Sequence, residues 1–378
     1  MKNKSLTPQI RFKGYEDEWV SRPFSEIVTR YSLLKYDETI PSVEYEDINS
    51  KKGTLNKDIF SKPIHKSGQY FQIGDILFGK LRPYLGNNLL ANFDGIAVGD
   101  FWIFKNGLAN TRFIYPFLYS KDYSYISNIS SGSKMPRSDW GLVSSWNFNI
   151  PSSEEEQTLI GGLFANIDKS IFEAEREITR LEKMKQASLQ KMFPRPGETT
   201  PEIRFDGFTE PWKMKSISQI LTIGNGCDYK HLSKGIIPVF GTGGIMTHVS
   251  KCLYDGESVF IGRKGTIDKP LYFNGKFWTV DTLFYTHSFV DAVPYFVYCL
   301  FQKINWQSYN AATGVPSLSK DVINTIEVTI PLPDEQKAIA NYFRNLDAII
   351  SAKRKKLEKL QNLKQSCLDK MFVNTTAQ

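Results

Sequence analysis

Cysteine and histidine are scarce in this chain, which has four of each among 378 residues. No two cysteines form a Cys-x-x-Cys pair, and no histidines have the spacing of metal ligands, so the sequence predicts no zinc site and no disulfide framework. We expect reduced cysteines and no bound metal. The cysteines are Cys227, Cys252, Cys299 and Cys367, and the histidines are His65, His231, His248 and His287.

Long apolar runs are missing as well. The N-terminal sequence MKNKSLTPQIRF lacks the apolar segment of a signal peptide, and stretches such as residues 295–301 are far too short to cross a bilayer. These two observations predict a cytoplasmic protein with no membrane association.

Catalytic motifs are absent or incomplete. The sequence GDILFGKL at residues 74–81 fits part of a phosphate-binding loop, but Leu81 stands where Ser or Thr would hold magnesium. The Asp334-Glu335 pair followed by Lys337 resembles a nuclease pattern, yet acidic residues at a helix start are explained by the helix dipole. No Asn-Pro-Pro-Tyr or Asp-Pro-Pro-Tyr tetrapeptide of amino-methyltransferases occurs. The sequence therefore predicts a chain that is not an enzyme.

An internal repeat is the strongest feature that is present. The motif TPQIRF near residue 7 returns as TPEIRF near residue 200, and a helical segment that starts at Ser153 returns near Pro333. Both helical segments begin after a proline-marked strand end with an acidic cluster and end in Lys-Met-Phe, at residues 191–193 and 370–372. The whole chain is thus predicted to be a duplication.

The repeated helical segments have apolar residues at alternating steps of three and four, the spacing of a coiled coil. Forty residues at 1.5 Å each make a rod of roughly 60 Å. Lys353 is the one interruption of the two stripes. The predicted seam consists of Phe164, Ile167, Ile171, Ile178 and Leu181 in the first helix and Phe343, Leu346, Ile350, Leu357 and Leu360 in the second.

The segments between the repeated parts read as mixed α/β. Residues 20–150 have strand-like runs at 74–81 and 96–104 and a helical run at 113–129. Residues 213–330 have strand-like runs at 236–240, 258–261 and 277–285 and a helical run at 294–309. Each segment carries three more basic than acidic residues, within a formal net charge of +7, which is compatible with a polyanionic partner.

These elements in this order resemble the specificity (S) subunit of type I restriction-modification systems. The motifs that carry the resemblance are the TPxIRF segments, the helix starts at Ile150 and Ile330 in which Ile-Pro is followed within a few residues by Glu-Gln, the LxKMF helix ends, and the run from Gly241 to Thr266. The expected fold is α/β (α+β), in which two globular mixed α/β target-recognition domains are separated by two long antiparallel coiled-coil helices with pseudo-twofold symmetry. The expected boundaries are 1–152 for the first domain, 153–195 for the central helix, 196–332 for the second domain, and 333–378 for the C-terminal helix.

The resemblance implies a sequence-specific subunit that reads an asymmetric, bipartite site in double-stranded DNA. It also implies partners, namely two modification (methyltransferase) subunits, which bind S-adenosylmethionine, and restriction (endonuclease/translocase) subunits; the chain itself is expected to hold no cofactor. Basic and aromatic residues on loops that bear glycine or proline are the candidates for DNA contact. They are Lys80, Arg82, Tyr84, Lys134, Arg137, Tyr229, Lys230, Arg263, Lys264, Lys269 and Lys320.

Two other interpretations remain open. A coiled-coil structural adaptor with two protein-binding domains would also need long helices, but it would not explain two basic, diverged domains between duplicated flanks. A self-contained nuclease or methylase is disfavoured by the missing motifs. Within the segments between the repeats, Trp102, Phe277 and Trp278 are expected in the cores rather than at the DNA.

Overall fold

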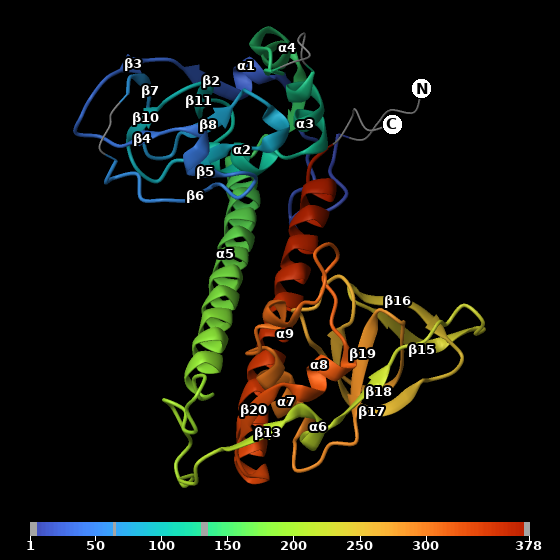
Figure 1. The fold of residues 1–378 in the computed structure, drawn as a ribbon. Coiled ribbons are helices and arrows are strands. Elements are labelled where there is room, and N and C mark those ends of the chain that lie inside the picture. The colour runs from blue at the N-terminus through green and yellow to red at the C-terminus, as the bar shows by residue number, and fades with distance from the viewer. Residues whose placement is uncertain (1–5, 63–65, 130–134, 374–378) are drawn as a thin grey trace. The chain divides into compact units, whose positions relative to one another are not determined.

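The structure is a computed structural model that describes residues 6–62, 66–129 and 135–373. The chain divides into two compact units, each of which contains part of both long helices. Unit 1 comprises residues 1–175 and 355–378, and unit 2 comprises residues 176–354. Helix α5 (Glu154–Lys191), labelled in Figure 1, follows the strands of unit 1 and precedes the strands of unit 2 in the chain. This order of elements confirms the expected fold class.

Unit 1 contains two four-stranded sheets and two small strand pairs. The strand orders of the larger sheets are β3-β7-β10-β4 and β2-β11-β8-β9, and β1 pairs with β12. Its strands are β1 (Val20–Pro23), β2 (Val28–Tyr31), β3 (Leu34–Lys35), β4 (Ser42–Val43), β5 (Ile48–Asn49), β6 (Thr54–Leu55), β7 (Gly68–Phe71), β8 (Ile76–Gly79), β9 (Asn88–Leu90), β10 (Gly95–Ala97), β11 (Phe101–Asn106) and β12 (Asn147–Ile150). Its short helices are α1 (Phe24–Ile27), η1 (Tyr45–Asp47), η2 (Pro83–Leu85), α2 (Thr111–Phe117), α3 (Lys121–Asn128) and α4 (Trp140–Ser145).

Unit 2 contains one six-stranded sheet with the order β14-β19-β17-β18-β15-β16, and β13 pairs with β20. Its strands are β13 (Lys213–Ser216), β14 (Thr222–Asn225), β15 (Lys234–Gly241), β16 (Gly244–Val249), β17 (Tyr254–Gly262), β18 (Leu271–Thr279), β19 (Leu283–His287) and β20 (Glu327–Ile330). Its helices are α6 (Ile217–Ile220), α7 (Pro294–Phe301), η3 (Trp306–Tyr309) and α8 (Lys320–Thr325), and α9 (Pro333–Lys370) begins in this unit.

Four runs that the sequence presents as single elements are broken. The strand-like run 96–104 becomes β10 and β11, because Gly99 adopts a φ of +106° between them. The run 277–285 likewise divides between β18 and β19. The helical run 113–129 divides into α2 and α3, because the Ser120 side chain caps a new helix by accepting a hydrogen bond from the Tyr123 amide. Similarly, the run 294–309 forms α7 and a separate turn, η3.

Both long helices begin where the sequence predicts. In α5 the Ser153 hydroxyl accepts a hydrogen bond from the Glu156 amide, and three glutamates occupy the first turn. In α9, which begins with Pro333, Asp334 and Glu335 occupy the first turn, and proline suits the first helical position because that position has no intrahelical bond to donate.

Within each unit the two helices run in opposite directions. In unit 1 Asp168 of α5 lies 2.6 Å from the Nζ of Lys364 on α9. In unit 2 Lys185 of α5 lies 2.7 Å from Asp347 of α9. Asp168 and Asp347 occupy equivalent positions of the repeat, as do Lys185 and Lys364, so the second ion pair is the symmetry counterpart of the first.

The expected seam between the helices is only partly buried. Both helices contribute buried members, whereas Ile171, Leu181, Leu357 and Leu360 are only half buried. Lys353, the predicted interruption, extends to Glu177, with 2.8 Å between its Nζ and the carboxylate. The buried members are Phe164, Ile167, Ile178, Phe343, Leu346 and Ile350.

Phenylalanines at the helix ends anchor the core of each unit. In unit 1 Phe372, which follows α9, stacks on Phe164 and contacts Phe113 of α2, both at 5.7 Å between ring centroids. In unit 2 Phe193, which follows α5, stacks on Phe296 of α7 at 5.4 Å. The positions are equivalent, so one aromatic arrangement is built twice. Trp102, Phe277 and Trp278 lie in the cores, as predicted.

A buried ion pair ties each TPxIRF segment to the start of a helix. Arg11 donates two hydrogen bonds, of 2.6 and 2.9 Å, to the carboxylate of Glu156 in unit 1. Arg204 donates two hydrogen bonds of 2.7 Å to Glu335 in unit 2. The hydrogen bond to each glutamate raises the pKa of the arginine above its usual value. A bidentate pair of this kind fixes both the distance and the orientation of the segment.

Replacing one partner of such a pair tests its contribution. The side chain of Glu335 is 2% exposed, so Glu335→Ala leaves the Arg204 guanidinium unpaired in a mostly buried site. We expect the free energy of unfolding of unit 2 to fall by about 3 kcal/mol in urea denaturation followed by circular dichroism. Asp334→Ala is the control, because its pair with Lys337 is exposed; a loss below about 1 kcal/mol is expected there. Equal losses in both variants would refute this role of the buried pair.

Candidate nucleic-acid interface

Two loops of unit 1 that carry predicted DNA contacts are joined by backbone hydrogen bonds. The amide of Ser138 donates to the carbonyl of Lys80 at 2.8 Å, and the amide of Arg82 donates to the carbonyl of Pro136 at 2.8 Å. Lys80 and Arg82 follow β8, whereas Pro136 and Ser138 precede α4. The structure thus brings together two of the predicted basic segments, which are more than fifty residues apart in the sequence.

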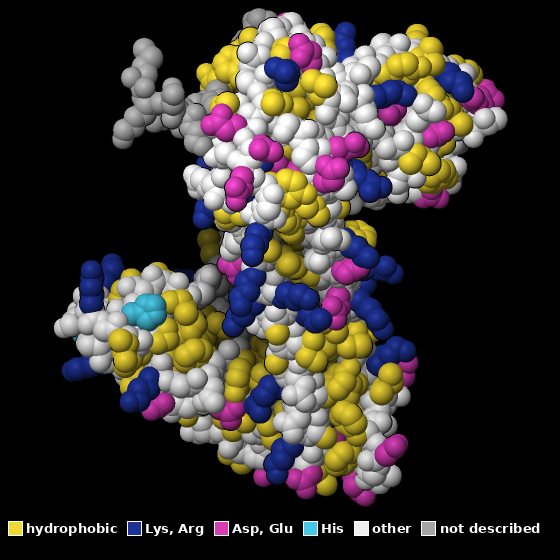
Figure 2. Space-filling view, turned by 180° about the vertical axis from the view of Figure 1, so that it is seen from behind, with side chains coloured by type: hydrophobic (Ala, Val, Ile, Leu, Met, Phe, Trp, Pro, Cys, Tyr) yellow, Lys and Arg dark blue, Asp and Glu magenta, His cyan; other side chains and the backbone are white. Residues whose placement is uncertain are grey.

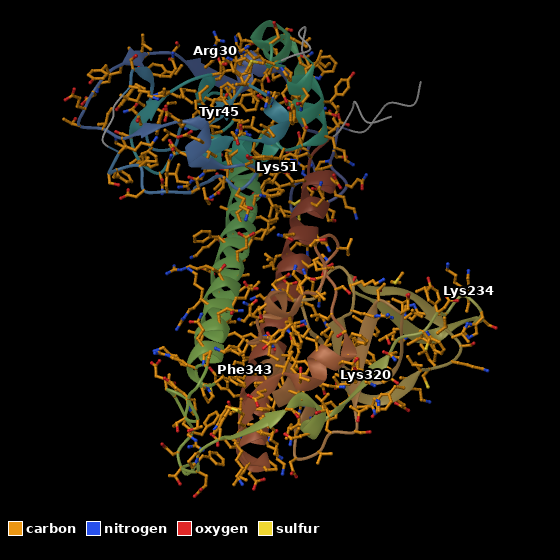
Figure 3. The ribbon with its side chains drawn as sticks, viewed as in Figure 1. Arg30, Tyr45, Lys51, Lys234, Lys320 and Phe343 are labelled. Carbon is orange, nitrogen blue, oxygen red and sulfur yellow. The ribbon has the colours of Figure 1, made fainter. Side chains whose placement is uncertain are left out.

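Tyr45 supports this pair of loops, although nothing in the sequence pattern marks it. Its hydroxyl donates a hydrogen bond to the carbonyl of Asp100 and accepts one from the amide of Leu81 at 3.1 Å. Its ring stacks on Phe101 with 4.5 Å between centroids. Burial raises the pKa of this hydroxyl well above its usual value, so the group stays protonated and can keep donating. Figure 3 labels Tyr45 within unit 1.

Charges on the joined loops are partly neutralised. Asp100 lies 2.8 Å from the Nε of Arg137 and 3.6 Å from the Nζ of Lys80, and all three side chains are partly exposed. Arg82 is exposed, adopts a φ of +49°, and has no ion pair within the described parts of the chain. Tyr84 beside it is 51% exposed. Arg82 and Tyr84 are therefore the freest of these predicted contacts.

Unit 2 repeats the arrangement with different side chains. The amide of Leu318 donates to the carbonyl of Arg263 at 2.9 Å, and the amide of Gly265 donates to the carbonyl of Pro316 at 2.9 Å. Arg263 thus takes the place of Lys80, and Lys264 takes the place of Leu81. Both Arg263 and Lys264 are exposed. The same backbone frame therefore presents a different set of groups.

The short helices that follow the joined loops are also equivalent. Asp139 caps α4 by accepting a hydrogen bond from the amide of Leu142 at 2.9 Å, and Ser319 caps α8 by accepting one from the amide of Val322 at 3.2 Å. Lys320 is the first residue of α8 and is partly exposed, which places a cation beside the loops of unit 2. Figure 3 labels Lys320 in this helix.

The remaining predicted contacts are dispersed or lie outside the described residues. Lys269 and Lys230 are exposed on other loops of unit 2. Tyr229 is partly buried and packs against the cluster formed by Val239 and Trp278, so its ring has an interior role. Lys134 lies outside the described residues.

Other kinds of site are not found in the described part of the chain. The interior of the GDILFGKL segment is the fully buried strand β8, and the segment does not form a phosphate-binding loop before a helix. Among the described residues, no three His, Cys, Asp or Glu side chains gather in a group that could hold a metal ion. No described helix has the length and apolar character needed to cross a membrane.

Comparisons with known proteins agree with this geometry. Residues 209–362 match the family model of the type I restriction modification DNA specificity domain. The specificity subunit of the type I restriction enzyme MjaVIII from Methanocaldococcus jannaschii is 19% identical over 334 residues, which cover 75% of this chain and 77% of that protein. The specificity subunit of the type I restriction enzyme EcoDI from Escherichia coli is 26% identical over 213 residues, which cover 53% of this chain and 47% of that protein.

Solved structures show the same fold. The S subunit of a type I restriction-modification system from M. genitalium superposes with a TM-score of 0.72 at 15% identity, over 98% of this chain and all of that one. A chain from a structure that describes complex assembly of the type I R-M system gives a TM-score of 0.53 at 17% identity, over 93% and 96% of the two chains.

The class that the chain resembles is therefore clear: residues 209–362 match a DNA specificity domain, and unit 1 repeats the pattern of loop and helix contacts found there. More narrowly, the chain is similar to type I restriction-modification specificity subunits in both its halves. The resemblance that the sequence indicates is thereby confirmed.

Neutralising the two exposed cations of unit 2 tests the interface. In the assembled complex, Arg263→Gln together with Lys264→Gln should weaken DNA binding, because each lost phosphate contact lowers the slope of log affinity against log salt by about 0.9. Lys337→Gln is the control, because Lys337 lies at the start of α9 and is paired with Asp334 at 3.0 Å. Titrations at several salt concentrations measure the effect. If the double variant keeps the DNA affinity and the salt slope of the parent, neither residue contacts DNA.

Proposed function

We propose that this chain reads DNA as the non-catalytic specificity subunit of a type I restriction-modification system. The observation that carries the proposal is the duplicated pair of loops, which has one backbone frame and two sets of exposed groups. Lys80, Leu81 and Arg82 in unit 1 correspond to Arg263, Lys264 and Gly265 in unit 2. A fixed frame with exchangeable side chains is suited to reading base sequence, since base edges are distinguished by the groups that face them.

The site that the chain reads is asymmetric and bipartite. Each unit carries its own joined loops, so each can read one part of the site. The units differ both in these loops and in the sheets behind them, because unit 1 has two four-stranded sheets and unit 2 has one six-stranded sheet. Two unlike readers recognise two unlike half-sites.

Each unit has a cleft, and the similarity of the two clefts favours the binding of two copies of one partner subunit. Unit 1 has a cleft of about 970 Å³ beside the Asp168–Lys364 pair and Tyr115. Unit 2 has a cleft of about 860 Å³ beside the Asp347–Lys185 pair and Tyr298. Because the same ion pair and a tyrosine border each cleft, two identical subunits can dock through the same contacts. We assign these positions to two modification subunits, which bind S-adenosylmethionine, and expect restriction subunits to join that assembly.

Methylome sequencing tests the proposed function. Cells that carry this chain with its partner subunits should modify one DNA sequence that is asymmetric and interrupted by unread bases, and cells that lack only this chain should not modify it. Modification that persists without the chain would contradict the proposal and favour a structural adaptor. An uninterrupted or palindromic site would contradict the assignment of one half-site to each unit.

Lengthening the helices tests whether they set the unread gap. A four-residue insertion after Glu177 adds about one turn, or roughly 6 Å of rise, against 3.4 Å per base pair. A matched insertion of four residues after Lys353, whose Nζ lies 2.8 Å from the carboxylate of Glu177, lengthens α9 by the same amount as α5. In the active double insertion, we expect the gap to grow by about one or two base pairs while both half-sites stay unchanged. The methylome of that variant measures this, and an unchanged gap would show that the helices do not set it.

A further inference from the structure

The outer half of the β15–β16 hairpin is a two-stranded ribbon. Strand β15 pairs with β18 only through Val239 and Phe240, as far as the described residues show. Before Val239, the partner of β15 is β16, with Pro238 opposite His248 and Ile237 opposite Val249. Figure 1 shows this hairpin at the margin of unit 2 farthest from α7, and Figure 3 shows Lys234 at its end.

A bulge in this ribbon pushes Ile236 into solvent. Lys234 and Ile237 both stand opposite Val249, so Gly235 and Ile236 are extra residues in β15. Gly235 is required there, since a Cβ at that position would lie 2.3 Å from the carbonyl oxygen of Val249. The side chain of Ile236 is 91% exposed, although isoleucine is among the residue types most often buried.

Three lysines lie close to the exposed isoleucine along the two strands and the loops that adjoin them. Lys230, Lys234 and Lys251 are all exposed, and none forms an ion pair with a carboxylate within the described ranges. The loop that carries Lys230 is held in place because Tyr229 and Leu232 pack on the cluster of Val239 and Trp278. Figure 2 shows Lys and Arg side chains at this outer margin of unit 2.

Protection of a sheet edge accounts for only part of this surface. Bulges and lysines on edge strands prevent pairing with other chains. An isoleucine that is almost fully exposed has the opposite effect, because it offers an apolar contact. An apolar tip among unpaired cations suits a partner that combines a polyanionic backbone with apolar groups between its charges. Double-stranded DNA has this chemistry, since its phosphates flank a major groove in which thymine presents a methyl group.

We propose that the β15–β16 ribbon enters the major groove of the half-site read by unit 2. Ile236 contacts a base edge there, and Lys234 and Lys251 contact the flanking phosphates. The major groove is about 12 Å wide and admits a two-stranded ribbon. The other end of the hairpin reaches the joined loops, because a Cβ on Gly265 would lie 3.9 Å from the Oγ1 of Thr242. This inference rests on the proposed function and adds a base-reading element to it.

The test uses the assembled complex and a duplex that carries the site found by methylome sequencing. Ile236→Ala should weaken binding to this duplex about fivefold to tenfold, leave binding to a random duplex unchanged, and leave the salt slope unchanged. Lys234→Gln should weaken binding to both duplexes and lower the salt slope by about 0.9. The matched controls are Met214→Ala and Lys213→Gln, which remove exposed residues of β13 and should bind both duplexes like the parent.

Three outcomes would overturn the inference. If both ribbon variants bind the two duplexes like the parent complex, the ribbon does not touch DNA. If Ile236→Ala weakens binding to both duplexes equally, Ile236 does not read a base. If the parent complex itself fails to prefer the methylome-derived duplex over the random one, the proposed function fails and the inference fails with it. A preference in the parent that falls only in Ile236→Ala supports both.

Discussion

The buried arginine–glutamate pair at each helix start is the interaction on which the rest of the structure depends. Glu156 and Glu335 serve both as acidic residues in the first helical turn and as the bidentate acceptors of Arg11 and Arg204. Each pair therefore fixes where a long helix begins relative to a TPxIRF segment. Replacing a mostly buried pair with apolar side chains need not destabilise a protein. We interpret its presence in both units as a means of fixing geometry rather than of adding stability.

The glutamine that follows each of these glutamates connects the start of the long helix to other backbone segments of the same unit. The side chain of Gln157 accepts a hydrogen bond from the amide of Asn110 and donates to the carbonyl of Pro151. Gln336 accepts from the amide of Val293 and donates to the carbonyl of Pro331. Both glutamines are buried and their polar atoms are used, so each Glu-Gln dipeptide joins the start of a long helix to the start of a short one, α2 in unit 1 and α7 in unit 2.

The sequence predicts the parts of this fold that depend on local or repeated signals. The duplication, the starts of both long helices and the burial of Trp102 and Trp278 follow from residue identity and spacing alone. The separation of β18 from β19 was missed, although the polar residues Asp281 and Thr282 lie between the two strands and are typical of a turn. The break after α2 depends on one capping hydroxyl, that of Ser120, which a helical pattern easily conceals.

The interface was predictable in composition but not in arrangement. Basic residues beside glycine or proline marked Lys80 and Arg263 as candidates. Their carbonyls accept hydrogen bonds from residues more than fifty positions away, which is a tertiary fact that no local pattern contains. Tyr45 escaped notice because its role depends on contacts with distant backbone groups. Ile236 escaped for a different reason: an isoleucine in an apolar strand is expected in a core, and only the bulge exposes it.

Unit 1 is built from two segments that are far apart in the sequence, and this has a consequence during synthesis on the ribosome. Unit 2 is continuous in sequence, so all its residues have been made before translation reaches residue 355. Unit 1 combines the first residues of the chain with the last, and Phe372 packs among the rings of Phe113, Phe117 and Phe164. These rings lack Phe372 as a neighbour until translation has passed residue 372. Unit 1 thus begins to emerge before unit 2 but is completed after it, and its exposed aromatic surface makes a nascent or truncated chain prone to aggregation.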